Sequence, residues 1–343
     1  MVWNIQALLE DVGIQSYDIW RNGSPITVSS IAPINRACFK DLSFCSSEGD
    51  DAIRAISSSG AGVILCNKSV KQRLGQIQEQ KYRQCLVFLD NPRLTMMHII
   101  NLVYKRKKSE LRRVSRSAIV SKTVKIGKNC SIGEFCVIGD DCEIGDNTTI
   151  HERVSILQNT RIGRNCDIQQ GVVIGADGFA YERHNETLEL ERFPHIGGVQ
   201  IGDDVEICSN CSIARGSLSD TIIGNGTKIN ALVHVAHNVE IGRNCACSAG
   251  VTIGGSTIIG DTCWLGQNST LKHKIKIGNK VIVGSGASVI DNIEDEDIVA
   301  GVPAKSIKYK VTSNQLFLMG GHAQKRKSRH IIMNRQLKRS SHR

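Results

Sequence analysis

The chain has 343 residues, of which 41% are apolar and only 4% aromatic, with 32 glycines. That length allows one large or two ordinary domains, and so few rings favour a core of small aliphatic side chains, as in a stacked repeat. No apolar run approaches the roughly 18 residues of a transmembrane helix, and the start lacks a signal-peptide pattern, so we expect a cytoplasmic protein. Thirteen cysteines, an odd number without an export signal, are expected to be reduced thiols.

The net charge of +10 is unevenly placed. Residues 321–343 hold eight Lys or Arg and no Asp or Glu, so the rest of the chain is near neutral. A neutral body, with aromatics not interleaved with the charge, argues against a nucleic-acid binder. The basic tail could instead dock an acidic carrier protein or the phosphates of coenzyme A, or it could simply be a solubilising tail.

Residues 1–116 lack any repeat and predict a small α/β domain. The hydrophobic pattern predicts a helix over 3–12, buried strands at 62–66 and 85–89, and a helix over 94–104 after Asn91-Pro92. A charged linker, from Lys105 to Arg116, is expected to follow.

A six-residue repeat dominates residues 117–305. Isoleucine recurs in strict register, mostly followed by glycine, and predicts a parallel β-helix in which three hexads close one coil and residues 18 apart stack. The first nine members of the register are Ile126, Ile132, Ile138, Ile144, Ile150, Ile156, Ile162, Ile168 and Ile174. Glycine or another small residue is expected to turn each corner. Residues 306–343 predict a short helix over 312–319 and then the basic tail.

Seven cysteines stand four residues after a register position. This periodicity indicates a small-residue slot inside the coil, since a metal site would need ligands that converge. We therefore predict structural thiols and no bound metal.

Two features break the repeat. An insertion at 176–195, which holds Phe179 and Tyr181, is expected to leave the coil as a binding loop. Further on, His237, Gly255 and His273 follow one another at intervals of 18 and predict one stacked column. A neutral imidazole beside an accessible backbone N–H offers a base and an oxyanion donor, which acyl transfer to an amine requires. From spacing alone, exposed corner histidines remain the other interpretation.

Three motifs resemble one family. Gly175-Ala176-Asp177-Gly178-Phe179-Ala180-Tyr181, the run from Arg215 to Gly226, and Ala236-His237-Asn238-Val239 are similar, in order and approximate spacing, to the UDP-3-O-acylglucosamine N-acyltransferases of lipid A synthesis. The resemblance implies a left-handed β-helix, an N-terminal nucleotide-recognition domain, and a homotrimer with active sites between subunits. It also implies transfer of a 3-hydroxyacyl group from an acyl carrier protein thioester to the amino group of a UDP-sugar, without a metal or redox cofactor.

The same resemblance assigns residue roles. His237 matches the general base and Gly255 the oxyanion amide. The candidate substrate contacts are Phe44, Asp177, Phe179, Tyr181, Arg215, Asp220, Asn230, Asn238 and His273.

Other functions stay open. Phe44 is followed by Cys45–Gly49 where the family has an Asn-Pro-Lys-Tyr-like run for uridine, and Gly301–Lys305 is an ending common in coenzyme A-dependent relatives. These features favour a coenzyme A-dependent N-acyltransferase acting on a dTDP-amino-deoxysugar for a surface polysaccharide. A zinc hydratase or hydrolase would need a third histidine beside His234 and His237. An inactive, purely structural β-helix is the last alternative.

Overall fold

The computed structural model describes residues 2–20, 27–74, 84–104 and 114–308. The predicted helix over 312–319, the basic tail and most of the charged linker lie outside these ranges. Two compact units divide between Glu110 and Leu111. The parallel bridge between Val114 and Ile132 shows that pairing with the β-helix begins at residue 114, two residues before the end of the predicted N-terminal domain.

The N-terminal unit is an α/β/α sandwich. Its sheet runs β2-β7-β6-β5-β4, in which only the β2–β7 pair is antiparallel. The described strands are β1 Trp3–Asn4, β2 Asp18–Trp20, β3 Thr27–Val28, β4 Ser30–Ile31, β5 Asp41–Cys45, β6 Val63–Asn67 and β7 Cys85–Leu89. The described helices are α1 Ile5–Asp11, α2 Gly49–Ser58, α3 Lys68–Leu74 and α4 Pro92–Val103.

Helices cover both faces of this sheet, and the continuous apolar runs of β6 and β7 fit this, because their side chains are buried on both sides. One core packs α1 and α4 against the sheet, and a second packs α2 and α3 against its other face. The predicted helix over 94–104 begins two residues earlier, because Asn91 caps it through Leu94 N–H and Pro92 occupies the first turn. The helix predicted over 3–12 is shorter, with Asn4 as its N-cap.

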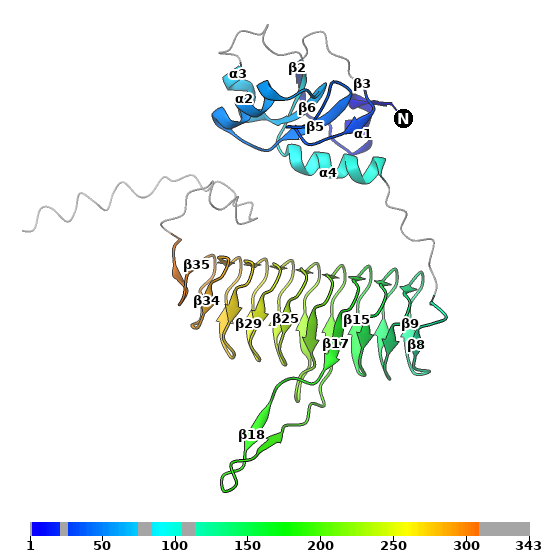
Figure 1. Ribbon diagram of the computed structural model, residues 1–343, viewed down its shortest axis with the longest axis vertical. Coiled ribbons are helices and arrows are strands. Elements are labelled where there is room, and N and C mark those ends of the chain that lie inside the picture. Colours follow the sequence, from blue (N-terminus) through cyan, green and yellow to red (C-terminus); the bar gives the residue numbers. More distant parts are fainter. Residues whose placement is uncertain (1, 21–26, 75–83, 105–113, 309–343) are drawn as a thin grey trace, which may run out of the picture. The chain divides into compact units, whose positions relative to one another are not determined.

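The second unit is a parallel β-helix with three sheets, drawn as a ladder of coils in Figure 1. The ten-stranded sheet holds β10 Ser131–Ile132, β13 Thr149–Ile150, β16 Asp167–Ile168, β21 Glu206–Ile207, β24 Lys228–Ile229, β27 Ala246–Cys247, β30 Trp264–Leu265, β33 Ile282–Val283, β35 Ile298–Ala300 and the antiparallel β36 Lys305–Ser306. The nine-stranded sheet holds β8 Ile119–Val120, β11 Val137–Ile138, β14 Ser155–Ile156, β17 Val173–Ala176, β22 Ser212–Ala214, β25 His234–Val235, β28 Thr252–Ile253, β31 Thr270–Leu271 and β34 Ser288–Val289.

The eight-stranded sheet holds β9 Lys125–Ile126, β12 Glu143–Ile144, β15 Thr160–Ile162, β20 Val199–Ile201, β23 Thr221–Ile223, β26 Glu240–Ile241, β29 Ile258–Ile259 and β32 Lys276–Ile277. The predicted stacking is confirmed, since Ile138 pairs with Ile156 and Ile156 with Ile174. The inward aliphatic residues form one continuous core along the helix. The predicted fold class is therefore correct for the described residues.

The corners differ in part from the expectation that glycine or another small residue turns them. The residue with positive φ lies two places after the usual position of that glycine, and Asn is the commonest residue there, as at Asn147 with φ 59°. Glycine is needed because coils stack closely: a Cβ on Gly145 would lie 2.6 Å from the carbonyl carbon of Gly163. The glycine after the isoleucine therefore permits stacking, and the residue two places later makes the turn. That residue is itself a glycine at Gly171, Gly226, Gly250 and Gly286.

The cysteine slot has a hydrogen-bonding role. The Cys142 thiol donates to the Leu157 carbonyl oxygen at 3.2 Å, and the Thr148 hydroxyl makes the equivalent bond to Gly163 at 2.8 Å. Burial raises the pKa of the Cys142 thiol, which keeps it protonated as a donor. All thirteen cysteines are free, and those in the slot satisfy corner carbonyls.

Candidate active site

His237 lies at the corner that follows β25, with its ring half-buried. Its Nδ1 is 3.0 Å from Oδ1 of Asn238, and that oxygen also accepts hydrogen bonds from the Ser217 N–H at 3.0 Å and the Ser217 hydroxyl at 2.6 Å. The Asn238 amide nitrogen donates to the Ser219 carbonyl and hydroxyl, which fixes the orientation of the amide. Because Oδ1 can only accept, Nδ1 of His237 carries a proton, and in the neutral ring Nε2 is the nitrogen with the free lone pair.

Gly255 stacks one coil beyond His237, as the spacing predicts. Val235 pairs with Ile253, and a Cβ built on Gly255 would lie 2.8 Å from Nε2 of His237. The basic nitrogen therefore rests against the Gly255 backbone. Only a residue without a side chain leaves room for the ring there.

The Gly255 N–H has no acceptor among the described residues. Equivalent N–H groups at the corner after the eight-stranded sheet are occupied: Lys128 donates to Asp146 at 2.6 Å and Arg243 to Asp261 at 2.7 Å. The Arg243 backbone and guanidinium hold the pKa of the Asp261 carboxyl below its ordinary value. The equivalent position one coil beyond Gly255 is His273 and not a carboxylate, so this corner presents a base beside an unoccupied donor.

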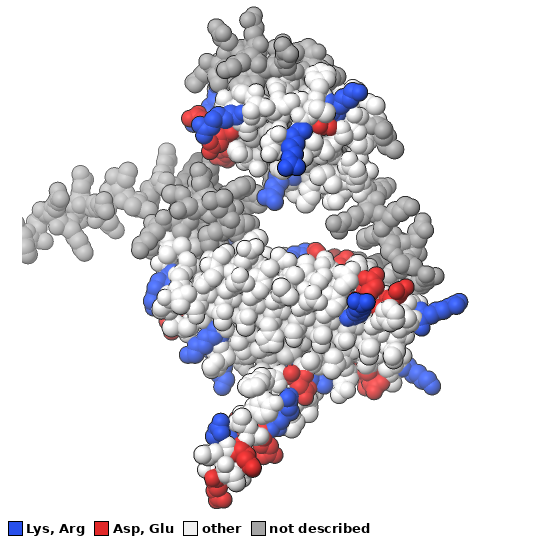
Figure 2. Space-filling view, in the orientation of Figure 1, with Lys and Arg blue, Asp and Glu red and all other residues white. Residues whose placement is uncertain are grey.

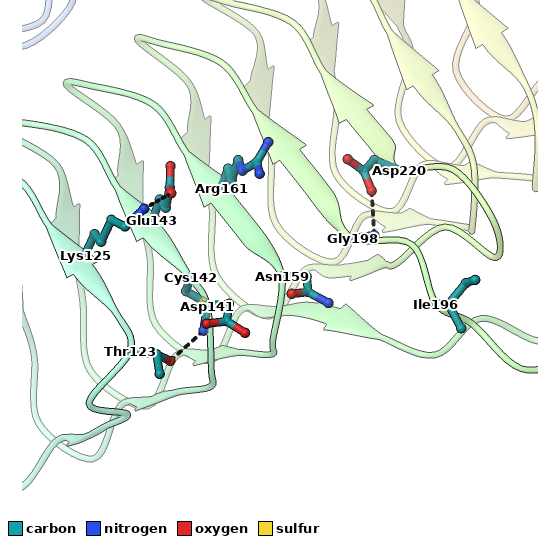
Figure 3. Close-up of a pocket in the computed structure, with 10 residues that line it drawn as sticks. All are labelled: Thr123, Lys125, Asp141, Cys142, Glu143, Asn159, Arg161, Ile196, Gly198 and Asp220. Carbon is teal, nitrogen blue, oxygen red and sulfur yellow. Dashed lines mark hydrogen bonds and ion pairs between the residues drawn. The ribbon is translucent and has the colours of Figure 1, made fainter.

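The loop at 215–220 ties this corner to the insertion. The Ser217 carbonyl accepts from the N–H groups of Ile196 and Gly197, at 2.8 and 3.1 Å. Asp220 accepts from the Gly198 N–H and from the side chain of Gln200, both at 2.6 Å. Asp220 thus fastens the end of the insertion, and its dashed bond to Gly198 is drawn in Figure 3.

The insertion at 176–195 is a β-hairpin, β18 Tyr181–Arg183 and β19 Leu190–Arg192, which projects from the coils in Figure 1. The Phe179 and Tyr181 rings are 4.9 Å apart, and the Arg192 guanidinium covers Tyr181 and donates to its hydroxyl at 2.6 Å. Asp177 faces Arg192 at 3.9 Å. Phe179 is 86% exposed, so this predicted binding residue is available at the surface.

Four predicted contacts are not gathered around His237. Arg215 is only 4% exposed, and its guanidinium donates to the Gln158 carbonyl oxygen at 2.6 Å. Asn230 is exposed after β24, on a different sheet, and its oxygen accepts from Ala231 N–H. His273 continues the column as an exposed side chain. Phe44 belongs to β5 of the N-terminal unit.

Two hollows of the described β-helix lie away from His237. A cavity of about 310 Å³, shown in Figure 3, includes Lys125, Glu143, Arg161 and Asp220 in its lining. A wider depression runs over the eight-stranded sheet. Neither includes His237, whose ring is half-buried at its corner. We place the chemistry at this corner because the oriented imidazole and free N–H occur there.

Sequence reasoning missed three parts of the site. Ser217 and Ser219 stand inside the Arg215–Gly226 motif, but nothing in their spacing shows that they hold Asn238. Gly178 stands in the first motif and packs on His237. His195, a buried ring beside His237, has no sequence signal at all.

Within the described parts of the chain, no three His, Cys, Asp or Glu side chains converge to hold a metal ion. His234 is exposed on β25 and makes no such cluster with His237. The described helices include none long and apolar enough to cross a membrane.

Comparison with known proteins agrees with the repeat. The family model "Bacterial transferase hexapeptide (six repeats)" matches residues 123–157, 141–176, 220–255 and 256–291. The UDP-3-O-acylglucosamine N-acyltransferase of Bordetella parapertussis is 41% identical over 156 residues, which are 45% of this chain and 43% of that protein. The matched region thus spans less than half the length of this curated relative.

Solved structures show the same fold. A UDP-N-acetylglucosamine acyltransferase from Francisella novicida is 28% identical with a TM-score of 0.53, covering 61% of this chain and 74% of its own. The corresponding protein of Bacteroides fragilis is 29% identical with a TM-score of 0.51, covering 57% and 73%. These likenesses confirm the left-handed β-helix. The chain is a hexapeptide-repeat protein that resembles, in its repeat and motifs, the UDP-3-O-acylglucosamine N-acyltransferase family.

Proposed function

We propose that this protein is an N-acyltransferase that moves an acyl group from a thioester to the amino group of a nucleotide-activated amino sugar. The observation that carries the proposal is the arrangement at His237: a fixed Nδ1 proton, a free Nε2 lone pair and the unoccupied N–H of Gly255 beside it. The name of the Bordetella relative supports a UDP-sugar as the acceptor.

The chemistry follows from these groups. The sugar amine attacks the thioester carbonyl and forms the C–N bond, while Nε2 of His237 takes the proton of that amine. The carbonyl oxygen becomes an oxyanion, which the Gly255 N–H stabilises. The tetrahedral intermediate then breaks its C–S bond, and the imidazolium returns the proton to the departing thiolate. Asn238 stabilises the imidazolium by accepting its Nδ1 hydrogen throughout.

The remaining assignments are part of this proposal. Phe44 would meet the nucleotide base, and the exposed Phe179 and the half-buried Tyr181 would meet substrate at the root of the hairpin. The other proposed substrate contacts are Asp177, Asp220, Asn230, Asn238 and His273, whereas the buried Arg215 holds the Gln158 carbonyl instead. No metal or redox group takes part. The donor is the thioester of an acyl carrier protein or of coenzyme A, and the acyl group is 3-hydroxyacyl.

A homotrimer with shared sites is also proposed. The His237 ring stays partly exposed in one chain, so a neighbouring subunit could cover it. In the face shown in Figure 2, charged side chains gather toward the ends and rim of the β-helix and leave the middle largely uncharged. Such a face can be buried between copies without stranding charges. A light-scattering mass equal to one subunit would contradict this arrangement.

The alternative is a coenzyme A-dependent enzyme for a dTDP-amino-deoxysugar. It is favoured by the ending Gly301–Lys305 and by the sequence Cys45–Gly49 after Phe44. The basic segment at 321–343 would suit either an acidic carrier protein or the phosphates of coenzyme A.

Mass spectrometry of the products tests both versions. UDP- and dTDP-amino sugars are each incubated with carrier-protein and coenzyme A thioesters, using the native chain and His237→Ala. An acyl mass increment on the sugar in one combination, lost in the variant, would establish the reaction and identify both substrates. An increment that persists in His237→Ala would remove this histidine from the mechanism, and no increment in any combination would contradict the proposed function.

A further inference from the structure

A second imidazole is buried against the proposed base. His195 is 7% exposed, and its ring meets that of His237 edge to face with 5.5 Å between the ring centres. Neither ring nitrogen of His195 has a hydrogen-bond partner among the described residues. Native folds rarely leave buried polar atoms unpaired, so the presence of this ring needs a reason.

His195 is one wall of a slot around His237. A Cβ on Gly255 would lie 2.8 Å from Nε2 of His237, and a Cβ on Gly178 would lie 2.9 Å from both its Cβ and its Cδ2. The same Gly178 Cβ would lie 2.9 Å from Nε2 of His195. The backbones of Gly178 and Gly255 and the ring of His195 therefore all touch the imidazole of His237.

Two of these walls come from the insertion. Gly178 stands near its beginning and His195 at its end, while the hairpin β18–β19 lies between them. The end is anchored, because Ile196 and Gly197 donate to the Ser217 carbonyl and Ser217 in turn bonds Asn238. The two ends of the insertion thus meet at the imidazole of His237. The loop at 215–220, which orients Nδ1 of His237, also fixes His195 in place.

The hydrogen bond from Nδ1 to Asn238 fixes one point of the His237 ring. It leaves the ring free to tilt about that point unless something packs against its sides. Since the His195 nitrogens are shielded and unpaired, the directional contact that this ring makes among the described residues is the edge-to-face contact with His237. Such ring pairs have a preferred geometry and stabilise it.

We propose that His195 is a positioning residue, whose buried ring holds the imidazole of His237 against Gly255 so that Nε2 meets the attacking amine. This inference rests on the proposed function of His237 as the base. A misplaced base lowers the rate of the chemical step and leaves substrate binding nearly intact. His195 should therefore influence kcat and hardly affect KM.

Two substitutions distinguish the effect of the packed ring of His195 from any effect of its two nitrogens. His195→Ala opens the slot, and we expect kcat to fall about 10- to 100-fold with KM for both substrates within about twofold. His195→Phe keeps a ring of similar shape without the unpaired nitrogens, and we expect kcat to stay within about threefold of the native value. Should the alanine variant not fold, His195→Leu, which fills the slot without a flat ring, is expected to lose about tenfold in kcat.

Two histidines that lie away from His237 serve as controls for the substitution of His195. His184 is exposed at the far end of the same hairpin, and His151 is half-buried elsewhere on the β-helix. Alanine at either should leave kcat unchanged. Native kcat in His195→Ala would overturn the proposal. So would a Phe variant as slow as Ala with a raised KM, because the nitrogens would then bind substrate.

A crystal structure of His195→Ala gives a readout that does not depend on activity. The His237 ring is expected to turn away from Gly255 or to adopt more than one orientation. If the native protein transfers no acyl group, the proposed function fails while this displacement still reports on positioning. If the native protein is active and the variant keeps both kcat and the His237 orientation, the positioning role alone is wrong.

Discussion

Gly255→Ala tests how much the position of the His237 ring matters, because it displaces the ring while every functional group of the site is kept. The substitution keeps the backbone N–H and adds one methyl group, which would lie 2.8 Å from Nε2, 2.9 Å from Cε1 and 3.2 Å from Cδ2 of His237. Ordinary contact begins near 3.4 Å, so the nearest ring atom must retreat by about 0.6 Å. Gly255 does not have a positive φ, so alanine introduces no backbone strain.

A shift of this size should be costly for acyl transfer. Misplacing a reacting group by about 1 Å can reduce a rate about 100-fold, so we expect kcat to fall about 10- to 100-fold, or about 1.4–2.8 kcal/mol in activation free energy. The assay is steady-state transfer with the substrate pair found by mass spectrometry. KM is expected to change little, because the methyl group points at the base.

The control is Gly286→Ala. Gly286 has φ 68° and nothing within 4 Å of an added Cβ, so alanine there strains the backbone without touching His237. We expect a lower Tm and native kcat from this variant. A Gly255→Ala protein with normal Tm and kcat within twofold of native would refute the placement of His237 as base.

Three further predictions concern orientation and stability. Asn238→Leu removes the acceptor of the Nδ1 proton and should lower kcat about 10- to 100-fold, measured in the same assay; native kcat would mean that the amide does not orient the base. Thr148→Val leaves the Gly163 carbonyl without its donor and should lower the free energy of unfolding in urea by about 1–3 kcal/mol, whereas Thr148→Cys, the residue used at equivalent slots, should lose less. The hydrogen bond to Asp167 raises the pKa of His151, so its stabilisation is complete below the unfolded value near 6.5 and is lost as pH rises through the folded pKa. Asp167→Asn should therefore destabilise the protein more at pH 6 than at pH 8.5 in urea unfolding, and an equal loss at both would contradict the assignment.

Much of the architecture follows from the sequence alone. The six-residue register names the inward side chains directly, because each coil repeats the same backbone path and pairs residue 138 with 156 and 156 with 174. The same arithmetic places Gly255 one coil beyond His237. The roles of glycine and of the residue with positive φ at the corners could not be separated by period, since both recur every six residues.

The site depends on contacts that periodicity does not encode. The insertion and the loop at 215–220 leave the repeat, and only their packing brings Ser217 to Asn238 and His195 to His237. The same packing turns Asp220 toward Gly198 and Arg215 toward Gln158, so side chains that a motif groups together have different tasks. A repeat fixes what stacks because its spacing is constant, whereas the irregular segments are fixed by tertiary contacts, and here those contacts orient the proposed base.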